Sequence, residues 1–423
     1  MSYQTPRGTY DILPEEIKGW QKMEELLRKQ SDLYGYQEIR TPIFESTSVF
    51  ARKNDSSDMV NKEMYTFQSG SESYTLRPEG TAGVIRSFVQ HKLYGTMEMP
   101  ARFCYIGPMF RHERPQKGRQ RQFTQYGVEN LGVRSPLIDA EVIALGYDIV
   151  QAMRIKSVKV LINTLGDDAS RETYRNALKE HFKPVVNELC GDCQRRYEQN
   201  PLRILDCKVD QEHPSLKSAP ALKDYLNEES RTYFSQVLSA LDELHIPYVV
   251  EDRLVRGLDY YTHTVFEVVS TRPESGAQAT VFGGGRYDHL VDYFGGPQMS
   301  GIGFAIGLER LLALSREECG TVQTQESIDV YVMGLGNVGN IPLTLVQKMR
   351  HAGYTAQANL LPRSLKAQFK TADRTKAAYL VIVGEEEMKQ NKVNIKRTSD
   401  KMQVTVDMDQ ILETIQNWEA EEE

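Results

Sequence analysis

The sequence has few cysteines and no long hydrophobic stretch. Its five cysteines among 423 residues are an odd number, which fits a reducing compartment and argues against a disulfide framework. No stretch approaches the roughly 20 consecutive apolar residues that a membrane-spanning helix needs. The first residues, MSYQTPRGTY, contain no apolar signal segment. We therefore expect a cytoplasmic protein with no membrane partner.

Two glycine motifs that bind phosphate are also missing. The pattern GxxxxGK[ST] does not occur, which argues against a P-loop nucleotide-binding protein. Gly301, Gly303 and Gly307 approach the dinucleotide fingerprint, but the third glycine comes one residue too late. These glycines instead predict a strand and a helix that pack closely and present Arg310 to phosphates.

Positive charge is scarce overall but concentrated in one region. The formal net charge of −7 argues against sequence-blind binding of nucleic acid. Between Arg102 and Arg134, however, seven Lys or Arg residues accompany two Glu residues, a local charge of +5. The alternation around Phe103 and Tyr105, with a Pro- and Gly-containing loop after it, predicts two strands joined by a turn. Because a guanidinium on a strand is costly to bury without a bidentate anion, Arg111 predicts a polyphosphate site.

One close pair of cysteines raises the question of metal binding. Cys190 and Cys193 are separated by two residues, and Cys207 and His213 follow downstream. The strong zinc signature has two close pairs, whereas this segment has one. We therefore expect no metal, although coordination by Cys190, Cys193, Cys207 and His213 stays open.

Hydrophobic periodicity divides the chain into a long mixed N-terminal part and a small C-terminal domain. Pro14 begins a predicted helix that ends near Gly35, and strand patterns with short helices follow. A helical insertion is predicted at about 168–230. Gly283–Gly285 predict either a turn before Tyr287 or a close approach of the backbone to a ligand. A polar linker precedes alternating strands and helices, which are typical of a small α/β domain.

Several segments together resemble one known family. FRHE at 110–113, with the basic loop and Phe123 after it, resembles motif 2 of the class II aminoacyl-tRNA synthetases. RGLDYYTHTVFE at 256–267 and TLRPEGTAG at 75–83 resemble the histidine-binding motifs of the histidyl-tRNA synthetase family. GIGFAIGLER at 301–310 resembles motif 3, and YGYQEIRTPIFE at 34–45 resembles motif 1. Because the C-terminal part is similar to the family's anticodon-binding domain, the likeness covers nearly the whole chain.

The resemblance implies an architecture. It consists of an α+β catalytic domain at 1–325, with the class II antiparallel sheet and the helical insertion, and an α/β anticodon-binding domain at 326–423. Nine Lys or Arg residues between Pro362 and Arg397 favour RNA contact by the second domain. The family also implies a homodimer formed through the motif 1 region around Pro42. Motif 2 residues Arg114, Gln116 and Lys117 are candidates for contacting the acceptor end of the tRNA.

The activity that the resemblance implies is histidine–tRNA ligation. The carboxylate of L-histidine attacks the α-phosphorus of ATP, pyrophosphate leaves, and the histidyl group passes to the 3′ end of histidine tRNA. Catalysis of this kind depends on positioning and on stabilising phosphate charge. Arg111 and Arg256 are the implied catalytic residues, and Mg²⁺ is implied with ATP. The implied ATP-binding residues are Arg111, Glu113, Arg119, Phe123 and Arg310.

The same motifs imply a site for the amino acid. Its implied residues are Glu79, Gly80, Thr81, Arg111, Gln125, Glu129, Arg256, Tyr260 and Tyr261. A buried carboxylate and a tyrosine hydroxyl, here Glu129 and Tyr261, can bind the two ring nitrogens of imidazole. Glu79 and Thr81 are implied near the α-amino group.

One alternative belongs to another class of protein. A catalytically silent, histidine-sensing regulatory subunit of histidine biosynthesis would share much of this sequence. Such paralogues usually lack the anticodon domain and parts of the motifs, all of which occur here. The sequence therefore favours the ligase.

Overall fold

The computed structural model describes residues 3–51, 59–115, 118–255, 260–273, 280–320, 327–361 and 363–421. Three residues of interest, Arg256, Gln116 and Lys117, lie outside these ranges. The chain divides into two compact units, Met1–Val322 and Gln323–Glu423. No helix in the described ranges is long and apolar enough to cross a membrane.

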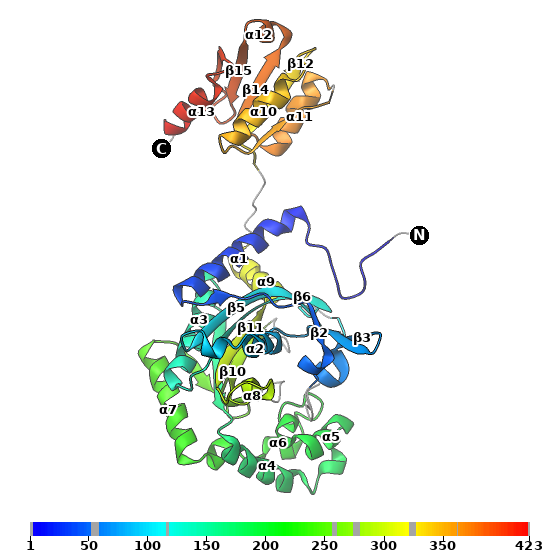
Figure 1. The fold of residues 1–423 in the computed structure, drawn as a ribbon, viewed down its shortest axis with the longest axis vertical. Coiled ribbons are helices and arrows are strands. Elements are labelled where there is room, and N and C mark those ends of the chain that lie inside the picture. The colour runs from blue at the N-terminus through cyan, green and yellow to red at the C-terminus, as the bar shows by residue number, and fades with distance from the viewer. Residues whose placement is uncertain are drawn as a thin grey trace. The chain divides into compact units, whose positions relative to one another are not determined.

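An eight-stranded sheet forms the centre of the first unit (Figure 1). In sheet order its strands are β1 (Gln37–Glu38), β5 (Ala101–Phe110), β6 (Gln122–Leu131), β11 (Gly301–Gly307), β10 (Thr280–Tyr287), β9 (Thr262–Ser270), β7 (Val158–Thr164) and β8 (Tyr248–Val250). The six central strands of this order, from β5 through β6, β11, β10 and β9 to β7, pair antiparallel with one another. The two edge strands are parallel to the strands beside them, β1 to β5 and β8 to β7. The predicted antiparallel sheet is therefore confirmed.

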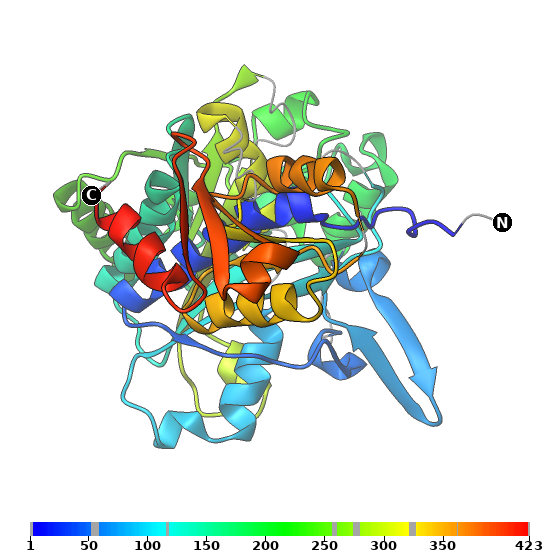
Figure 2. The ribbon, with the colours of Figure 1, turned by 90° about the horizontal axis from the view of Figure 1, so that it is seen from above.

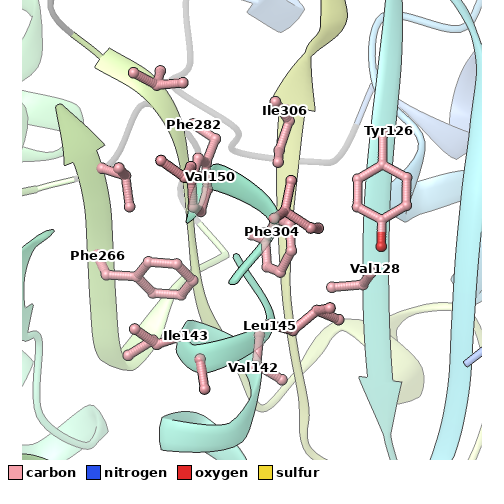
Figure 3. Packing of buried hydrophobic residues seen from close by; sticks show 14 of the residues in the cluster. Tyr126, Val128, Val142, Ile143, Leu145, Val150, Phe266, Phe282, Phe304 and Ile306 are labelled. Atoms are coloured by element: carbon pink, nitrogen blue, oxygen red, sulfur yellow. The ribbon is translucent and has the colours of Figure 1, made fainter. Parts of the chain in front are cut away.

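One face of this sheet packs against helices. They are α1 (Pro14–Leu33), α3 (Pro136–Ala152), α7 (Glu228–Glu243) and α9 (Leu308–Cys319). Figure 3 shows part of this core, in which Tyr126, Val128, Phe266, Phe282, Phe304 and Ile306 of the strands meet Val142, Ile143, Leu145 and Val150 of α3. Burial of each such side chain contributes about 1.5–3 kcal/mol to the free energy of folding. Because side chains alternate along a strand, the residues between them face the opposite side of the sheet.

The opposite face of the sheet carries α2 (Thr81–Gln90) and the short helix α8 (Leu290–Tyr293). Val84 and Phe88 of α2 are buried in one cluster with Phe103 and Tyr105 of β5. A separate three-stranded sheet contains, in order, β2 (Phe44–Ser46), β4 (Glu72–Leu76) and β3 (Tyr65–Ser69). Its β3–β4 hairpin projects from the body of the unit in both ribbon views (Figures 1 and 2). Three short helical turns in this part are η1 (Thr47–Val49), η2 (Met59–Glu63) and η3 (Leu93–Gly95).

The segment between β7 and α7 is helical, as predicted. It contains α4 (Asp168–Phe182), η4 (Val186–Glu188), α5 (Gly191–Gln199), η5 (Pro201–Ile204), α6 (Pro214–Lys217) and η6 (Leu222–Tyr225). The Asp167 carboxylate caps α4 by accepting a hydrogen bond from the Ser170 N–H at 2.8 Å. Apolar residues of these helices, among them Tyr174, Phe182 and Leu216, form a core distinct from that under the sheet.

Gly283–Gly285 do not form a turn. They lie within β10 and pair with β9 on one side and β11 on the other. A Cβ on Gly284 would lie 2.1 Å from the Gly303 carbonyl oxygen, so the neighbouring backbone leaves no room for a side chain. Of the two alternatives considered from the sequence, the turn is therefore wrong, because a run of glycines also fits a strand that a second backbone approaches closely. The other alternative, a close approach of the backbone to a ligand, stays a prediction, and Gly283 lines the small pocket described below.

The second unit is a mixed α/β fold. Its sheet order is β13 (Ala356–Ala358), β12 (Val330–Leu335), β14 (Tyr379–Gly384), β15 (Lys392–Arg397) and β16 (Gln403–Asp407). The first three strands are parallel, and the last two pair antiparallel. The helices are α10 (Ile341–His351), α11 (Leu365–Thr375), α12 (Glu385–Lys389) and α13 (Ile411–Ala420). The predicted small α/β fold is confirmed.

Candidate active site

Two adjoining cavities lie in the first unit. The large pocket, of about 430 Å³, is lined among others by Glu113, Arg119, Phe123 and Glu309. The small pocket, of about 190 Å³, is lined among others by Glu79, Thr81, Glu129, Tyr260 and Tyr287. Arg111, Gln125, Tyr261 and Arg310 line both pockets. A molecule with two chemically different ends can therefore reach from one pocket into the other.

The alternation of β6 places three of the predicted residues on the pocket side. Tyr126 and Val128 are buried in the core beneath the sheet, so Phe123, Gln125 and Glu129 face the other way. Glu129 pairs with Gly303 of β11, and a Cβ on that glycine would lie 2.2 Å from a Glu129 carboxylate oxygen. The glycine thus provides the space that the carboxylate occupies.

The small pocket ends at the buried carboxylate of Glu129, which is 1% exposed. The Thr81 hydroxyl donates to its Oε1 at 2.6 Å, and the Tyr105 hydroxyl lies 3.5 Å from the same oxygen. Tyr287 donates a short hydrogen bond to Oε2. The desolvation that accompanies burial raises the pKa of Glu129 to about 8, although the Thr81 and Tyr287 hydrogen bonds act in the other direction. A pKa of about 8 favours the protonated carboxyl at neutral pH.

The Glu79–Gly80–Thr81 segment enters the small pocket at the start of α2. Glu79 Oε1 accepts a hydrogen bond from the Ala82 N–H at 3.0 Å and so pairs one of the free backbone N–H groups in the first turn of α2. Its Oε2 lies 3.4 Å from the Tyr260 hydroxyl. Gly80 lines neither of these two pockets. Its role is steric, because a Cβ there would lie 2.2 Å from the ring of Tyr105.

Arg111 stands where the two pockets join. Its Nε donates to the Pro78 carbonyl at 2.8 Å, and its guanidinium carbon lies 5.4 Å from the centre of the Phe123 ring. The side chain is 26% exposed, and its Nη1 lies 3.9 Å from Glu113. One edge of the guanidinium is thus anchored on the backbone, which leaves the Nη groups for an anion.

Further charged groups surround the large pocket. Arg119 Nη1 donates to Glu113 at 3.1 Å, and Arg310 donates to the Thr280 and Gly118 carbonyls. Burial, followed by the nearby Arg119 charge, lowers the pKa of Arg310 from its ordinary value. An anionic ligand would offset both the desolvation of the Arg310 guanidinium and its repulsion by Arg119. The arrangement fits the triphosphate of a nucleotide.

Of the predicted site residues that the structure describes, all except Gly80 line one or both pockets. Arg256 lies outside the described residues. Sequence reasoning missed Tyr105, Tyr287 and Glu309. Burial raises the pKa of Glu309 to about 7, and its carboxylate accepts the Thr124 N–H at 2.7 Å. Glu309 directly precedes Arg310 in motif 3, whereas the two tyrosines had no signal beyond strand alternation.

His213 does not join the cysteines. Its Nδ1 lies 2.7 Å from the Ser215 hydroxyl, and its Nε2 lies 3.6 Å from Glu188. The residue that instead lies with Cys190, Cys193 and Cys207 is Asp210. The fourth ligand considered from the sequence, His213, is therefore wrong. Spacing along the chain does not reveal that the segment between η5 and α6 brings Asp210, and not His213, to the cysteines.

Comparison with known proteins shows the family to which the chain belongs. A family model described as histidyl-tRNA synthetase matches residues 8–311, and an anticodon binding domain model matches residues 329–418. The chain is 50% identical to histidine–tRNA ligase 1 of Shouchella clausii over 409 residues, which is 96% of each chain. It is 48% identical to histidine–tRNA ligase of Bacillus subtilis over 415 residues, 97% of this chain and 98% of the relative. The crystal structure of apo Staphylococcus aureus histidyl-tRNA synthetase matches with a TM-score of 0.84 at 42% identity, and the match covers 98% of this chain and 100% of that one.

Proposed function

This chain belongs to the histidyl-tRNA synthetase family, and on that premise we propose that it is an ATP-dependent histidine–tRNA ligase. One observation carries the proposal: a small pocket with a buried carboxylate shares Arg111 with a large pocket that four arginines line. Histidine fits the first pocket and ATP the second. The two would meet at Arg111, where the amino acid carboxylate attacks the α-phosphorus.

The first step depends on charge stabilisation by arginines. Arg111 holds the α-phosphate and the histidine carboxylate, and Arg310 and Arg119 bind the leaving phosphates. Phe123 stacks on the adenine, and Glu113 reaches its polar edge. Removal of one preorganised donor from such a site costs about 10²–10³ in rate. No nucleophilic side chain is required, because the substrate carboxylate is the nucleophile.

Two features of this step rest on the motifs. Arg256, in the RGLDYY segment, is proposed as the second catalytic cation, opposite Arg111. Mg²⁺ is proposed with ATP, where it would neutralise charge on the leaving β- and γ-phosphates. Glu113, Glu267 and Glu309 line the large pocket, and carboxylates are the ligands that Mg²⁺ prefers.

Specificity for histidine is proposed to come from Glu129 and Tyr261. The ionised Glu129 accepts the imidazole N–H, and the tyrosine hydroxyl serves the other ring nitrogen. Glu79 and Thr81 bind the α-amino group, with Gln125 and Tyr260 completing the pocket. An amino acid without these ring nitrogens would leave Glu129 buried and unpaired, so discrimination can reach about 10⁴-fold without editing.

The remaining assignments concern partners and domains. We assign residues 1–325 to catalysis and 326–423 to the anticodon of histidine tRNA. Arg114, Gln116 and Lys117 are proposed to contact the acceptor end. A homodimer formed near Pro42 and a cytoplasmic location also belong to this proposal. Relatives that match over nearly the full length are named histidine–tRNA ligase, so the regulatory-subunit alternative is not favoured.

Histidine-dependent exchange between ATP and pyrophosphate tests the activity directly. The full chain should catalyse exchange only when histidine is present and should charge histidine tRNA. A protein that binds histidine but supports no exchange would be the regulatory subunit instead.

A truncated chain ending at Gln325 tests the division into domains. We expect it to keep histidine-dependent exchange within a few-fold and to lose most tRNA charging, because every proposed small-molecule contact lies at or before Arg310. Circular dichroism and sedimentation should verify that the truncated chain is folded and in the same oligomeric state. Loss of exchange in such a folded protein would refute the division.

A further inference from the structure

Three cysteines and one aspartate of the helical insertion converge on one point. Cys190 and Cys193 lie at the start of α5, Cys207 follows η5, and Asp210 comes three residues later. One ligand atom from each, namely three Sγ atoms and a carboxylate oxygen, lie within 4.8 Å of one another. Cys193 and Cys207 are buried, and Cys190 and Asp210 are half-buried. Side chains from two separate segments of the chain, the start of α5 and the loop after η5, thus meet at one position.

Two distances within this cluster match those around a tetrahedral metal. Zinc with Zn–S bonds of about 2.3 Å and a Zn–O bond of about 2.0 Å holds its ligand atoms about 3.5–3.8 Å apart. The sulfurs of Cys190 and Cys207 are 3.7 Å apart, and Cys207 Sγ lies 3.6 Å from Asp210 Oδ2. A disulfide would place two sulfurs at about 2.0 Å, and all five cysteines are free.

Backbone groups around the cluster favour negative charge on its members. The Asp210 N–H lies 3.4 Å from Cys207 Sγ, and the Cys190 N–H donates to both Asp210 oxygens at 3.2 and 3.0 Å. Cys190 and Cys193 also begin a nine-residue helix, whose N-terminus stabilises thiolates. A metal would supply the opposite charge that this enclosed set needs.

We propose that Cys190, Cys193, Cys207 and Asp210 form a structural zinc site. Four protein ligands leave no open coordination position, which is typical of structural rather than catalytic zinc. On binding, one Zn²⁺ replaces the three thiol protons, which pass to solvent, and three thiolates and one carboxylate hold the ion. Soft thiolates select zinc over the hard cations Mg²⁺ and Ca²⁺.

The site has a consequence for the large pocket. Arg203, in η5 between Cys193 and Cys207, is 6% exposed and lines the large pocket. A metal that ties Cys193 to Cys207 restrains the loop that carries this arginine. Loss of zinc should therefore raise the KM for ATP more than the KM for histidine, an effect that rests on the proposed function.

Metal analysis of the full chain tests the site. The protein would be purified in reducing buffer without a metal-chelating resin, and zinc per chain would be measured by mass spectrometry. We expect about one zinc per chain, and a loss of most of it in Cys207→Ser and Asp210→Asn. Two matched controls should keep their zinc: Cys319→Ser, at an exposed cysteine, and Asp192→Asn, at a partly exposed aspartate of α5 that pairs with Lys62.

A second measurement covers ligand variants that fail to fold. Zinc would be removed from the parent with a chelator under reducing conditions and replaced by Co²⁺. Thiolate-rich tetrahedral cobalt should give strong visible absorption, and the metal-free chain should melt at a lower temperature than the zinc-loaded one. Two results would overturn the site. One is a parent protein that contains no zinc either as purified or after incubation with Zn²⁺. The other is an unchanged zinc content in folded Cys207→Ser and Asp210→Asn. Normal zinc content without histidine-dependent exchange would instead contradict the proposed function.

Discussion

The two halves of the candidate active site are built on different physical principles. In the small pocket, Glu129, Thr81 and Tyr287 are buried and bonded to one another. In the large pocket, the Arg111 and Arg119 side chains are 26% and 41% exposed. Their acceptors are a backbone carbonyl and a neighbouring glutamate. The small pocket is therefore preorganised, whereas the large one holds cations on local acceptors that a polyphosphate can replace.

This difference separates selectivity from chemistry. A neutral imidazole offers two weakly polar nitrogens, so its recognition requires buried partners whose unmet hydrogen bonds are costly. A triphosphate has several negative charges, which attract even partly solvated arginines. We expect mutations in the small pocket to affect histidine alone and mutations at the junction to affect the reaction itself.

The largest effect should come from Arg111, which lies at the junction. Arg111→Ala should lower histidine-dependent pyrophosphate exchange about 10²–10³-fold, because it removes a preorganised donor from the developing phosphate charge. Arg114→Ala removes an exposed cation three residues away and should leave exchange within a few-fold, since no tRNA takes part. Similar rates for the parent and a folded Arg111→Ala protein would remove Arg111 from the catalytic step.

Glu129→Gln should produce the next largest effect. The neutral amide keeps the shape but loses a charge-assisted hydrogen bond, so KM for histidine should rise about 10–100-fold, equivalent to about 1.5–3 kcal/mol. KM for ATP should change little. Glu309→Gln, at the buried carboxyl of the large pocket, should have the opposite selectivity: KM for ATP should change a few-fold, and KM for histidine should change little. Equal damage to both substrates by Glu129→Gln would mean that Glu129 is only structural.

The affinity for histidine should depend on pH through Glu129. The empty pocket has a pKa of about 8 at this carboxyl, and the bound imidazole requires its ionised form. The Kd for histidine should therefore fall about fivefold from pH 7 to pH 8, because the ionised fraction of Glu129 rises from about one-tenth to about one-half. Calorimetry on the parent and on Glu129→Gln checks this, and the same pH dependence in both proteins would refute the assignment.

The same pKa shift should also make thermal stability depend on pH. Because burial raises the pKa of Glu129 from 4.5 to about 8, the folded chain binds one proton more than the unfolded chain between these pH values. The free energy of unfolding contributed by this group therefore falls as pH rises through that window. Glu129→Gln lacks the ionisation, so its melting temperature should exceed that of the parent more at pH 9 than at pH 6. Equal differences at both pH values would show that the pKa is ordinary in the folded chain.

Sequence reasoning reached most of the fold because its signals were local. Pro14 at the start of α1 and the alternation in β6 each depend on residues close in the chain. It did not decide between two alternatives at Gly283–Gly285, and the turn was wrong because the strand there depends on pairing with β11. It also failed at the fourth residue of the cysteine cluster. Both errors involve partners whose distance along the chain does not reveal their distance in space.

The sequence by itself determined the kinds of chemistry available: arginines for phosphate, a carboxylate and tyrosines for imidazole, and motifs that resemble one family. Only the tertiary structure decided which groups meet. It placed Tyr287, 158 residues away along the chain, against Glu129, and it placed Asp210 rather than His213 with the cysteines. It also set the pKa of Glu129, because that value comes first from burial. Desolvation and long-range contacts arise only when distant segments pack, so no local pattern of residues encodes them.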